Sequence, residues 1–130
     1  MILLDTHVAL WILAEPDKLS HASTAELKRA LSAGELLAIS AITLFEVANA
    51  IRRGRIQASV PSRNFLQQIQ SAFGVYPVSE SIAVLAGQLA EPFPGDPMDR
   101  LIAATAIQEN CTLITADRKI LAAAACKTLW

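Results

Sequence analysis

The sequence has few of the residues that define several protein classes. Its two cysteines, Cys111 and Cys126, are too few for a disulfide framework, and both lie among apolar residues, as buried free thiols do. No uninterrupted apolar run is long enough for a membrane span, and the N-terminus lacks the basic segment that opens a secretory signal. We therefore expect a cytoplasmic protein with no membrane segment.

Charged residues are also scarce, at 18% of the chain, and neither sign dominates, because the net charge is −1 and the isoelectric point is about 6.1. A broad basic face for nucleic acid is thereby excluded, so a nucleic-acid substrate would be held by local cations. The hydrophobic content of 53% and mean hydropathy of +0.40 favour an apolar surface covered by another subunit or partner. The length fits one domain, residues 1–130.

Short apolar runs alternate with helical segments along the chain. We predict strands at 2–4, 36–40, 75–78 and 112–114, with a fifth, edge strand at 127–129. We predict helices at 7–13, 24–33, 44–53, 61–73, 79–89, 98–109 and 118–125. This alternation predicts an α/β fold with a mostly parallel sheet covered by helices on both faces.

Acidic residues stand where four apolar runs end and helices begin, and they are Asp5, Glu46, Asp99 and Asp117. If the runs are neighbouring parallel strands, the four carboxylates emerge at one edge of the sheet, where open α/β folds place their ligands. Converging anions require a cation, and oxygen ligands suit Mg²⁺ or Mn²⁺. Such a centre typically performs phosphodiester hydrolysis.

Helix capping is the competing interpretation of each acid taken singly. Asp5 and Asp117 have the positions of N-cap residues. Thr43–Glu46 and Asp96–Asp99 each have the spacing of a capping box. Capping does not explain why an acid, rather than Ser, Thr or Asn, occurs at all four turns.

Asp99 is the most informative of these acids. The apolar segment Leu101–Ile107 makes its helix a buried one, so the carboxylate must face a polar or charged partner, which a metal ion would provide. Two roles are open for Asp96, which can be an N-cap or a further metal contact.

The four acidic segments resemble the motifs of PIN-domain ribonucleases, and most closely those of the VapC-like toxins of bacterial toxin–antitoxin pairs. The segments are Leu3–His7, Ser40–Glu46, Gly95–Ala104 and Leu113–Asp117, and the likeness extends to Trp130. The resemblance implies a three-layer α/β/α fold with a central sheet of four to five strands. It also implies a Mg²⁺-dependent endoribonuclease that forms a homodimer and binds a cognate antitoxin.

The same resemblance assigns roles to particular residues. Asp5, Glu46, Asp99 and Asp117 become the metal-site acids, with Thr6 and Thr115 as supporting hydroxyls toward the substrate. Water activated by the metal then cleaves RNA without a side-chain nucleophile and leaves 5′-phosphate and 3′-hydroxyl ends. Met98 stands where the motif often has an aromatic residue, and segment 57–70 matches nothing in the family pattern.

Basic residues near the acids allow two interpretations. Arg52, Arg53 and Arg55 follow the predicted helix of Glu46, where they can stabilise its C-terminus or bind RNA phosphates. Arg100, beside Asp99, can position the backbone of the substrate or pair with an acid.

Three other functions compete with an RNA-cleaving enzyme. A haloacid-dehalogenase-like phosphatase needs a second acid at the position of His7. A receiver-like signalling domain needs an acidic pair at the first strand and a lysine after the last, and neither is clear. A non-catalytic PIN-like domain would bind protein or RNA only, which the four retained acids disfavour.

Overall fold

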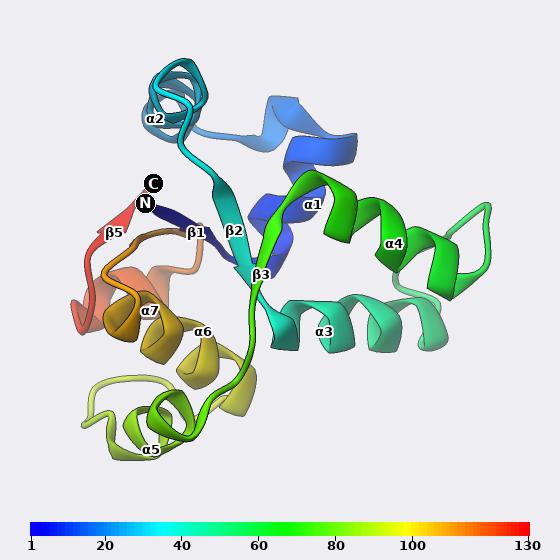
Figure 1. Cartoon of the computed structure of the whole chain (residues 1–130). Helices are drawn as coiled ribbons and strands as arrows, with labels where there is room; N and C mark the ends of the chain where they lie inside the picture. The colour runs from blue at the N-terminus through cyan, green and yellow to red at the C-terminus, as the bar shows by residue number, and fades with distance from the viewer.

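In the computed structural model, which describes residues 1–130, five strands form one entirely parallel sheet (Figure 1). The strands are β1 (Ile2–Leu4), β2 (Leu37–Ser40), β3 (Gly74–Tyr76), β4 (Thr112–Ile114) and β5 (Thr128–Leu129). Their spatial order is β3-β2-β1-β4-β5, so β1 is central and pairs with both β2 and β4. The predicted α/β class and the fifth, edge strand are confirmed.

Helices cover both faces of this sheet, as the alternation predicts. They are α1 (Thr6–Ala14), α2 (His21–Ser32), α3 (Ala41–Arg52), α4 (Ser62–Ala72), α5 (Glu80–Gln88), α6 (Pro97–Gln108) and α7 (Arg118–Ala123), with a short 3₁₀ helix at Pro16–Lys18. Figure 1 shows α3 and α4 side by side, extending away from the sheet, and α5 against α6 at another corner.

The strands are apolar because both of their faces are buried. In β1, Leu4 joins a cluster with Val8 and Val47 from the helices of one face, whereas Leu3 joins a cluster with Ile102 on the other. Successive side chains of a strand point to opposite faces, so a short run of apolar residues can fill two cores. The three-layer α/β/α arrangement follows from this alternation.

Helix α6 is buried along most of its length, as its apolar sequence predicts. Ile102 and Ala103 face the sheet, and Ala104 packs against Ile82 and Ala86 of α5. The small alanine side chains allow α5 to lie close to α6. Because α6 is fixed on both sides, the acids at its N-terminus have a rigid base.

Two helices begin three residues earlier than predicted, and one of these differences concerns the candidate site. Helix α2 starts at His21 because Ser20 is its N-cap. Helix α3 starts at Ala41, where the hydroxyl of Ser40 accepts a hydrogen bond from the backbone N–H of Ile42. Thr43 therefore lies inside α3, and the predicted capping box of Thr43–Glu46 is wrong.

The other boundaries agree to within one to three residues. Strand β3 ends at Tyr76 rather than at 78, and α7 ends at Ala123, followed by Ala124 with a φ of 50°. None of the helices combines the length and the apolar character needed to cross a membrane.

Candidate metal centre and active-site cleft

The candidate site lies at the carboxyl ends of the central strands. Asp5 and Thr115 directly follow β1 and β4, and the strand order reverses direction around β1, which is where open α/β sheets form a ligand-binding crevice. Glu46 comes from the second turn of α3, and Asp99 from the first turn of α6. Two strands, β1 and β4, and two helices, α3 and α6, therefore position the predicted acids.

Asp5 is 7% exposed, and both of its carboxylate oxygens accept hydrogen bonds. Oδ1 accepts from the backbone N–H of Thr6 at 2.8 Å, and Oδ2 accepts from the Thr115 hydroxyl at 2.7 Å. The oxygen of Thr115 in turn accepts from the N–H of Asp117 at 3.1 Å. Thr115 thus links two of the predicted acids.

Asp117 and Asp96 act as N-caps, as the capping interpretation expects. Asp117 accepts hydrogen bonds from Lys119 and Ile120 at the start of α7. Asp96 accepts from Met98 and Asp99 at the start of α6. In each case only Oδ1 is used, so the second carboxylate oxygen remains available to a ligand.

Glu46 does not cap any helix. Its Oε1 accepts a hydrogen bond of 2.6 Å from the Thr6 hydroxyl, whose oxygen lies 3.0 Å from the hydroxyl oxygen of Thr43. A hydroxyl has one proton, so Thr6 donates to Glu46 and accepts from Thr43. Thr43 is completely buried and was missed by sequence reasoning, although its position three residues before Glu46 places both on one side of α3.

The pKa of Asp99 is raised from its ordinary value of 3.8 to about 7. Burial is the largest cause, and the negative charges of Asp96, Asp5, Asp117 and Glu46 add to it. No side-chain hydrogen bond or ion pair compensates this carboxylate, in contrast to the acids that cap helices.

The pKa of Glu46 is also raised, mainly by burial and further by the charges of Asp5 and Asp96. The hydrogen bond from Thr6 and the proximity of His7 oppose the shift without reversing it. Both pKa shifts have the same two causes, which are burial first and then the negative charge that accumulates here without a neutralising side chain.

The ion pairs of the chain lie elsewhere. Lysine, arginine and the terminal amine pair with Glu15, Glu26 and Glu35, and with none of the predicted site acids. A partly buried group of carboxylates without cationic partners is unfavourable unless it is protonated or binds a cation.

The oxygen donors fit a hard divalent ion, although the side chains are spread apart. In this conformation no three His, Cys, Asp or Glu side chains lie close enough to hold one ion, whereas the charge of four acids reaches Asp99. The backbone brings the acids to one edge of the sheet, whereas their carboxylates repel one another and those of Asp5, Asp96 and Asp117 turn toward backbone N–H groups. Carboxylate and hydroxyl oxygens are the ligands that Mg²⁺ and Mn²⁺ prefer.

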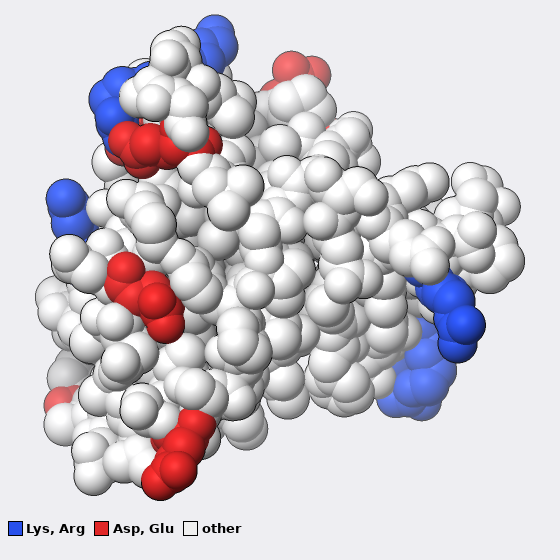
Figure 2. Space-filling view, in the orientation of Figure 1, with Lys and Arg blue, Asp and Glu red and all other residues white.

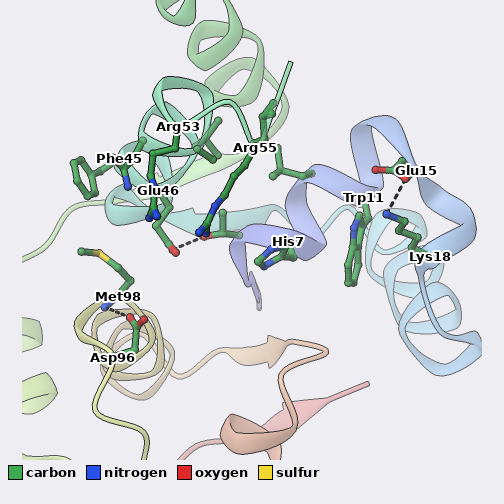
Figure 3. Close-up of a pocket in the computed structure, with 16 residues that line it drawn as sticks. His7, Trp11, Glu15, Lys18, Phe45, Glu46, Arg53, Arg55, Asp96 and Met98 are labelled. Atoms are coloured by element: carbon green, nitrogen blue, oxygen red, sulfur yellow. Dashed lines mark hydrogen bonds and ion pairs between the residues drawn. The ribbon is translucent and has the colours of Figure 1, made fainter. Parts of the chain in front are cut away.

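An open cleft of about 460 Å³ leads away from the acids between α1 and α3. Figure 3 shows Glu46 and Asp96 on opposite sides of its inner end, and the side chains of His7, Arg53 and Arg55 along it. Asp5, Asp99 and Asp117 do not line the cleft, so it meets the acidic group at one side only.

Among the predicted basic residues, Arg53 and Arg55 differ in position from Arg52. Arg53 and Arg55 line the cleft, and Figure 2 shows Lys and Arg side chains gathered at the outer end of the α3–α4 pair. Arg52 instead donates to the side-chain oxygen of Asn49 at 2.7 and 3.2 Å.

The guanidinium of Arg100 is occupied by the protein itself. It donates hydrogen bonds to the carbonyl oxygens of Ala86, Gly87, Leu89 and Pro94. These bonds fasten the loop that precedes α6. The structure therefore gives Arg100 backbone partners and no ion pair with Asp99 or another acid.

Comparisons with known proteins agree with this architecture. Residues 2–125 match the PIN domain family. The chain is 41% identical over 119 residues to ribonuclease VapC22 of Mycobacterium tuberculosis, covering 92% of this chain and 88% of that protein.

Two solved structures have the same fold. One is VapBC2 from Rickettsia felis bound to a DNA fragment from its promoter, with a TM-score of 0.75, 21% identity, and coverage of 100% of this chain and 99% of that one. The other is a toxin–antitoxin complex from Klebsiella pneumoniae, with a TM-score of 0.67, 22% identity, and coverage of 100% and 97%.

Proposed function

The chain belongs to the PIN-domain family, as a VapC-type ribonuclease, and we propose that its acidic centre hydrolyses RNA as the toxin of a type II toxin–antitoxin system. The observation that carries this proposal is the group of carboxylates at the carboxyl edge of the sheet that no lysine or arginine neutralises. Ribonucleases of this family depend on a metal ion. For this chain we propose Mg²⁺, with Mn²⁺ as a substitute.

We assign Asp5, Glu46, Asp99 and Asp117 to the metal centre. Asp96 has one carboxylate oxygen outside its cap and is proposed as an additional contact. When bound, a divalent ion lowers the pKa of a water and offsets negative charge on the scissile phosphate. No side-chain nucleophile is then needed.

The neighbouring hydroxyls hold the acids in place. Thr6 orients Glu46, and Thr115 orients Asp5. The metal centre can therefore form without a large change of the backbone, because the hydroxyls come from the rigid ends of α1 and β4.

Arginine residues are proposed to hold the RNA backbone. Arg53 and Arg55 face the cleft, and their guanidinium groups suit phosphate oxygens. Arg52 is exposed and bonded to Asn49, and it is assigned a supporting electrostatic contribution. Because the substrate is cellular RNA, we expect the reaction to take place in the cytoplasm.

We further propose that the chain, residues 1–130, acts as one nuclease unit that forms a homodimer and binds a cognate antitoxin. Large apolar side chains are exposed, including Leu13 at 47%, Phe45 at 54% and Leu36 at 64%. The similar Klebsiella pneumoniae structure is a toxin–antitoxin complex. Light scattering should give a dimer, and a monomer at tens of micromolar with no affinity for the product of the neighbouring gene would contradict this assembly.

Cleavage assays test the function directly. Purified protein should cleave single-stranded RNA with Mg²⁺ or Mn²⁺ and lose this activity in EDTA. Asp5→Asn, Glu46→Gln and Asp99→Asn should each reduce cleavage by about a hundredfold or more, as expected when a charge-stabilising group is lost.

Glu80→Gln provides the matched control, because Glu80 is an exposed acid in the first turn of α5, away from the site. It should keep the parent activity. Undiminished cleavage in EDTA would contradict the metal mechanism. RNA binding without any cleavage would favour the non-catalytic PIN-like alternative, whereas the receiver-like alternative is already replaced by the family match.

A further inference from the structure

Aromatic residues gather in the active-site cleft, although they make up only 5% of the chain. Trp11 and Phe45 line the cleft together with the imidazole ring of His7. The His7 and Trp11 ring centroids are 6.0 Å apart, and the ring of the second tryptophan, Trp130, lies 5.7 Å from that of Trp11. The metal chemistry needs none of these rings.

The rings of His7 and Trp11 start at the acidic centre and lead away from it. His7 follows Thr6, which donates to Glu46, and Trp11 lies one helical turn further along α1. Figure 3 shows the two rings next to each other along α1, with His7 on the side of Glu46. A strand whose phosphate sits at the acids would therefore pass over His7 and then Trp11.

The Trp11 ring is held firmly. Trp130 packs against it, and the ammonium group of Lys18 lies over the ring, 5.9 Å from its centroid, while forming an exposed 2.9 Å ion pair with Glu15. His7 is exposed to solvent and Trp11 is half-buried. A rigid, partly exposed ring of this kind loses little entropy when a flat ligand stacks on it.

The opposite wall of the cleft carries two arginines as well as Phe45 and Glu46. Arg53 and Arg55 come from the C-terminal end of α3 and the segment that follows it, and face the same space as the rings (Figure 3). Proteins hold single-stranded nucleic acid in grooves that combine cationic groups with aromatic faces, and this cleft contains both. A peptide would need a continuous apolar surface, whereas acids and arginines interrupt this one.

We propose that His7 and Trp11 form a stacking subsite for an unpaired nucleobase of the RNA, next to the scissile phosphate. This proposal rests on the proposed ribonuclease function. It implies that cleavage occurs next to a base that can unstack from its neighbours in the RNA. Arg53 and Arg55 hold the backbone while the base lies on α1.

Tryptophan fluorescence tests the stacking without any cleavage. In Trp130→Phe, Trp11 is the only tryptophan, and EDTA keeps the RNA intact. A short single-stranded RNA should quench this fluorescence with saturation, and an abasic residue at one position should remove most of the quenching. Equal quenching by every abasic RNA would show phosphate contacts only and overturn the proposal, as would absence of quenching by any RNA.

Kinetics test the same ring in the active protein. Trp11→Leu should raise KM for RNA by about five- to hundredfold with little change in kcat, the range that loss of one base stack produces. Trp11→Phe keeps a ring and should restore most of the affinity. If both variants behave alike, or if the loss in Trp11→Leu is confined to kcat, the subsite is wrong.

The two proposals can fail separately. Quenching that depends on one base, in a protein that does not cleave, would contradict the metal chemistry and keep the subsite. Cleavage by the parent together with an unchanged KM in Trp11→Leu would keep the metal chemistry and contradict the subsite. Should Trp11→Leu not fold, the abasic series on Trp130→Phe still decides.

Discussion

Thr6 and Glu46 are 40 residues apart in the sequence, and the hydroxyl of Thr6 donates a 2.6 Å hydrogen bond to Oε1 of Glu46. The bond joins the first residue of α1 to the second turn of α3. Since the single proton of the Thr6 hydroxyl goes to Glu46 while its oxygen accepts from Thr43, the two bonds fix which way the hydroxyl points. The Glu46 carboxylate is thereby held at the inner end of the cleft.

Removing this hydroxyl should reduce activity without removing any charge. Thr6→Val keeps the shape of the side chain but leaves Glu46 and Thr43 without their partner, so kcat/KM should fall by about five- to hundredfold. Thr6→Ser keeps the hydroxyl and should recover most of the activity. Parent-like cleavage by Thr6→Val would show that Glu46 needs no such positioning.

Arg100 should affect stability more than substrate binding. Lysine cannot reach all four carbonyl oxygens that the guanidinium satisfies. Arg100→Lys should therefore lower the free energy of unfolding in urea by about 1–3 kcal/mol. Arg118→Lys is the control, because the Arg118 side chain is exposed and forms no hydrogen bond. If Arg100→Lys raised the KM for RNA and left the stability unchanged, Arg100 would be a substrate contact instead.

The stability of the metal-free protein should increase as the pH falls from about 8 to about 5. The pKa of Asp99 is about 7 in the folded protein against an ordinary value of 3.8, so between these values the folded state binds a proton that the unfolded chain does not. The gain in stability begins as the pH falls through about 7 and is complete below the pKa of 3.8 that applies to the unfolded chain. Glu46, whose pKa is also raised, acts in the same direction.

Thermal melts in EDTA across this pH range measure the effect. Asp99→Asn cannot take up the proton and should have a flatter profile than the parent. Saturating Mg²⁺ should flatten the parent profile too, because the ion replaces the proton as the neutralising charge. A parent protein whose melting temperature falls steadily toward acid pH would contradict the clustering of charge at Asp99.

Much of the fold could be predicted because the strands carry a strong local pattern. Leu3 and Leu4 are apolar since each faces a different buried layer, and that condition is visible in three consecutive residues. Glycine at 34 and 54 marks two helix ends, and both have a positive φ, which glycine adopts without strain.

The detailed site could not be predicted in the same way. The start of α3 depends on whether Ser40 or Thr43 caps it, and both fit the local rules. Burial of Thr43 against Thr6 decides, and that is a contact between distant segments. The carbonyl partners of Arg100 lie 6 to 14 residues earlier, at the end of α5 and in the loop that follows it, and the path of this loop is not specified by the sequence.

Asp99→Asn separates the metal interpretation from the capping interpretation by stability alone. The substitution preserves the shape of the side chain and removes one negative charge from a group that nothing neutralises. In EDTA at pH 8 the variant should therefore melt a few degrees above the parent, because repulsion from the four neighbouring acids is relieved.

Mg²⁺ should raise the melting temperature of the parent more than that of Asp99→Asn. The parent binds the ion only when folded, so its melting temperature should rise with Mg²⁺ concentration, whereas the rise in Asp99→Asn should be much smaller. If Asp99 served only the helix, Asn would be neutral or slightly destabilising, since a favourable charge at the N-terminus of α6 is lost, and Mg²⁺ would affect neither protein. Four melts, of parent and variant with EDTA and with Mg²⁺, decide the matter. A destabilised variant together with a parent indifferent to Mg²⁺ would refute the convergent centre.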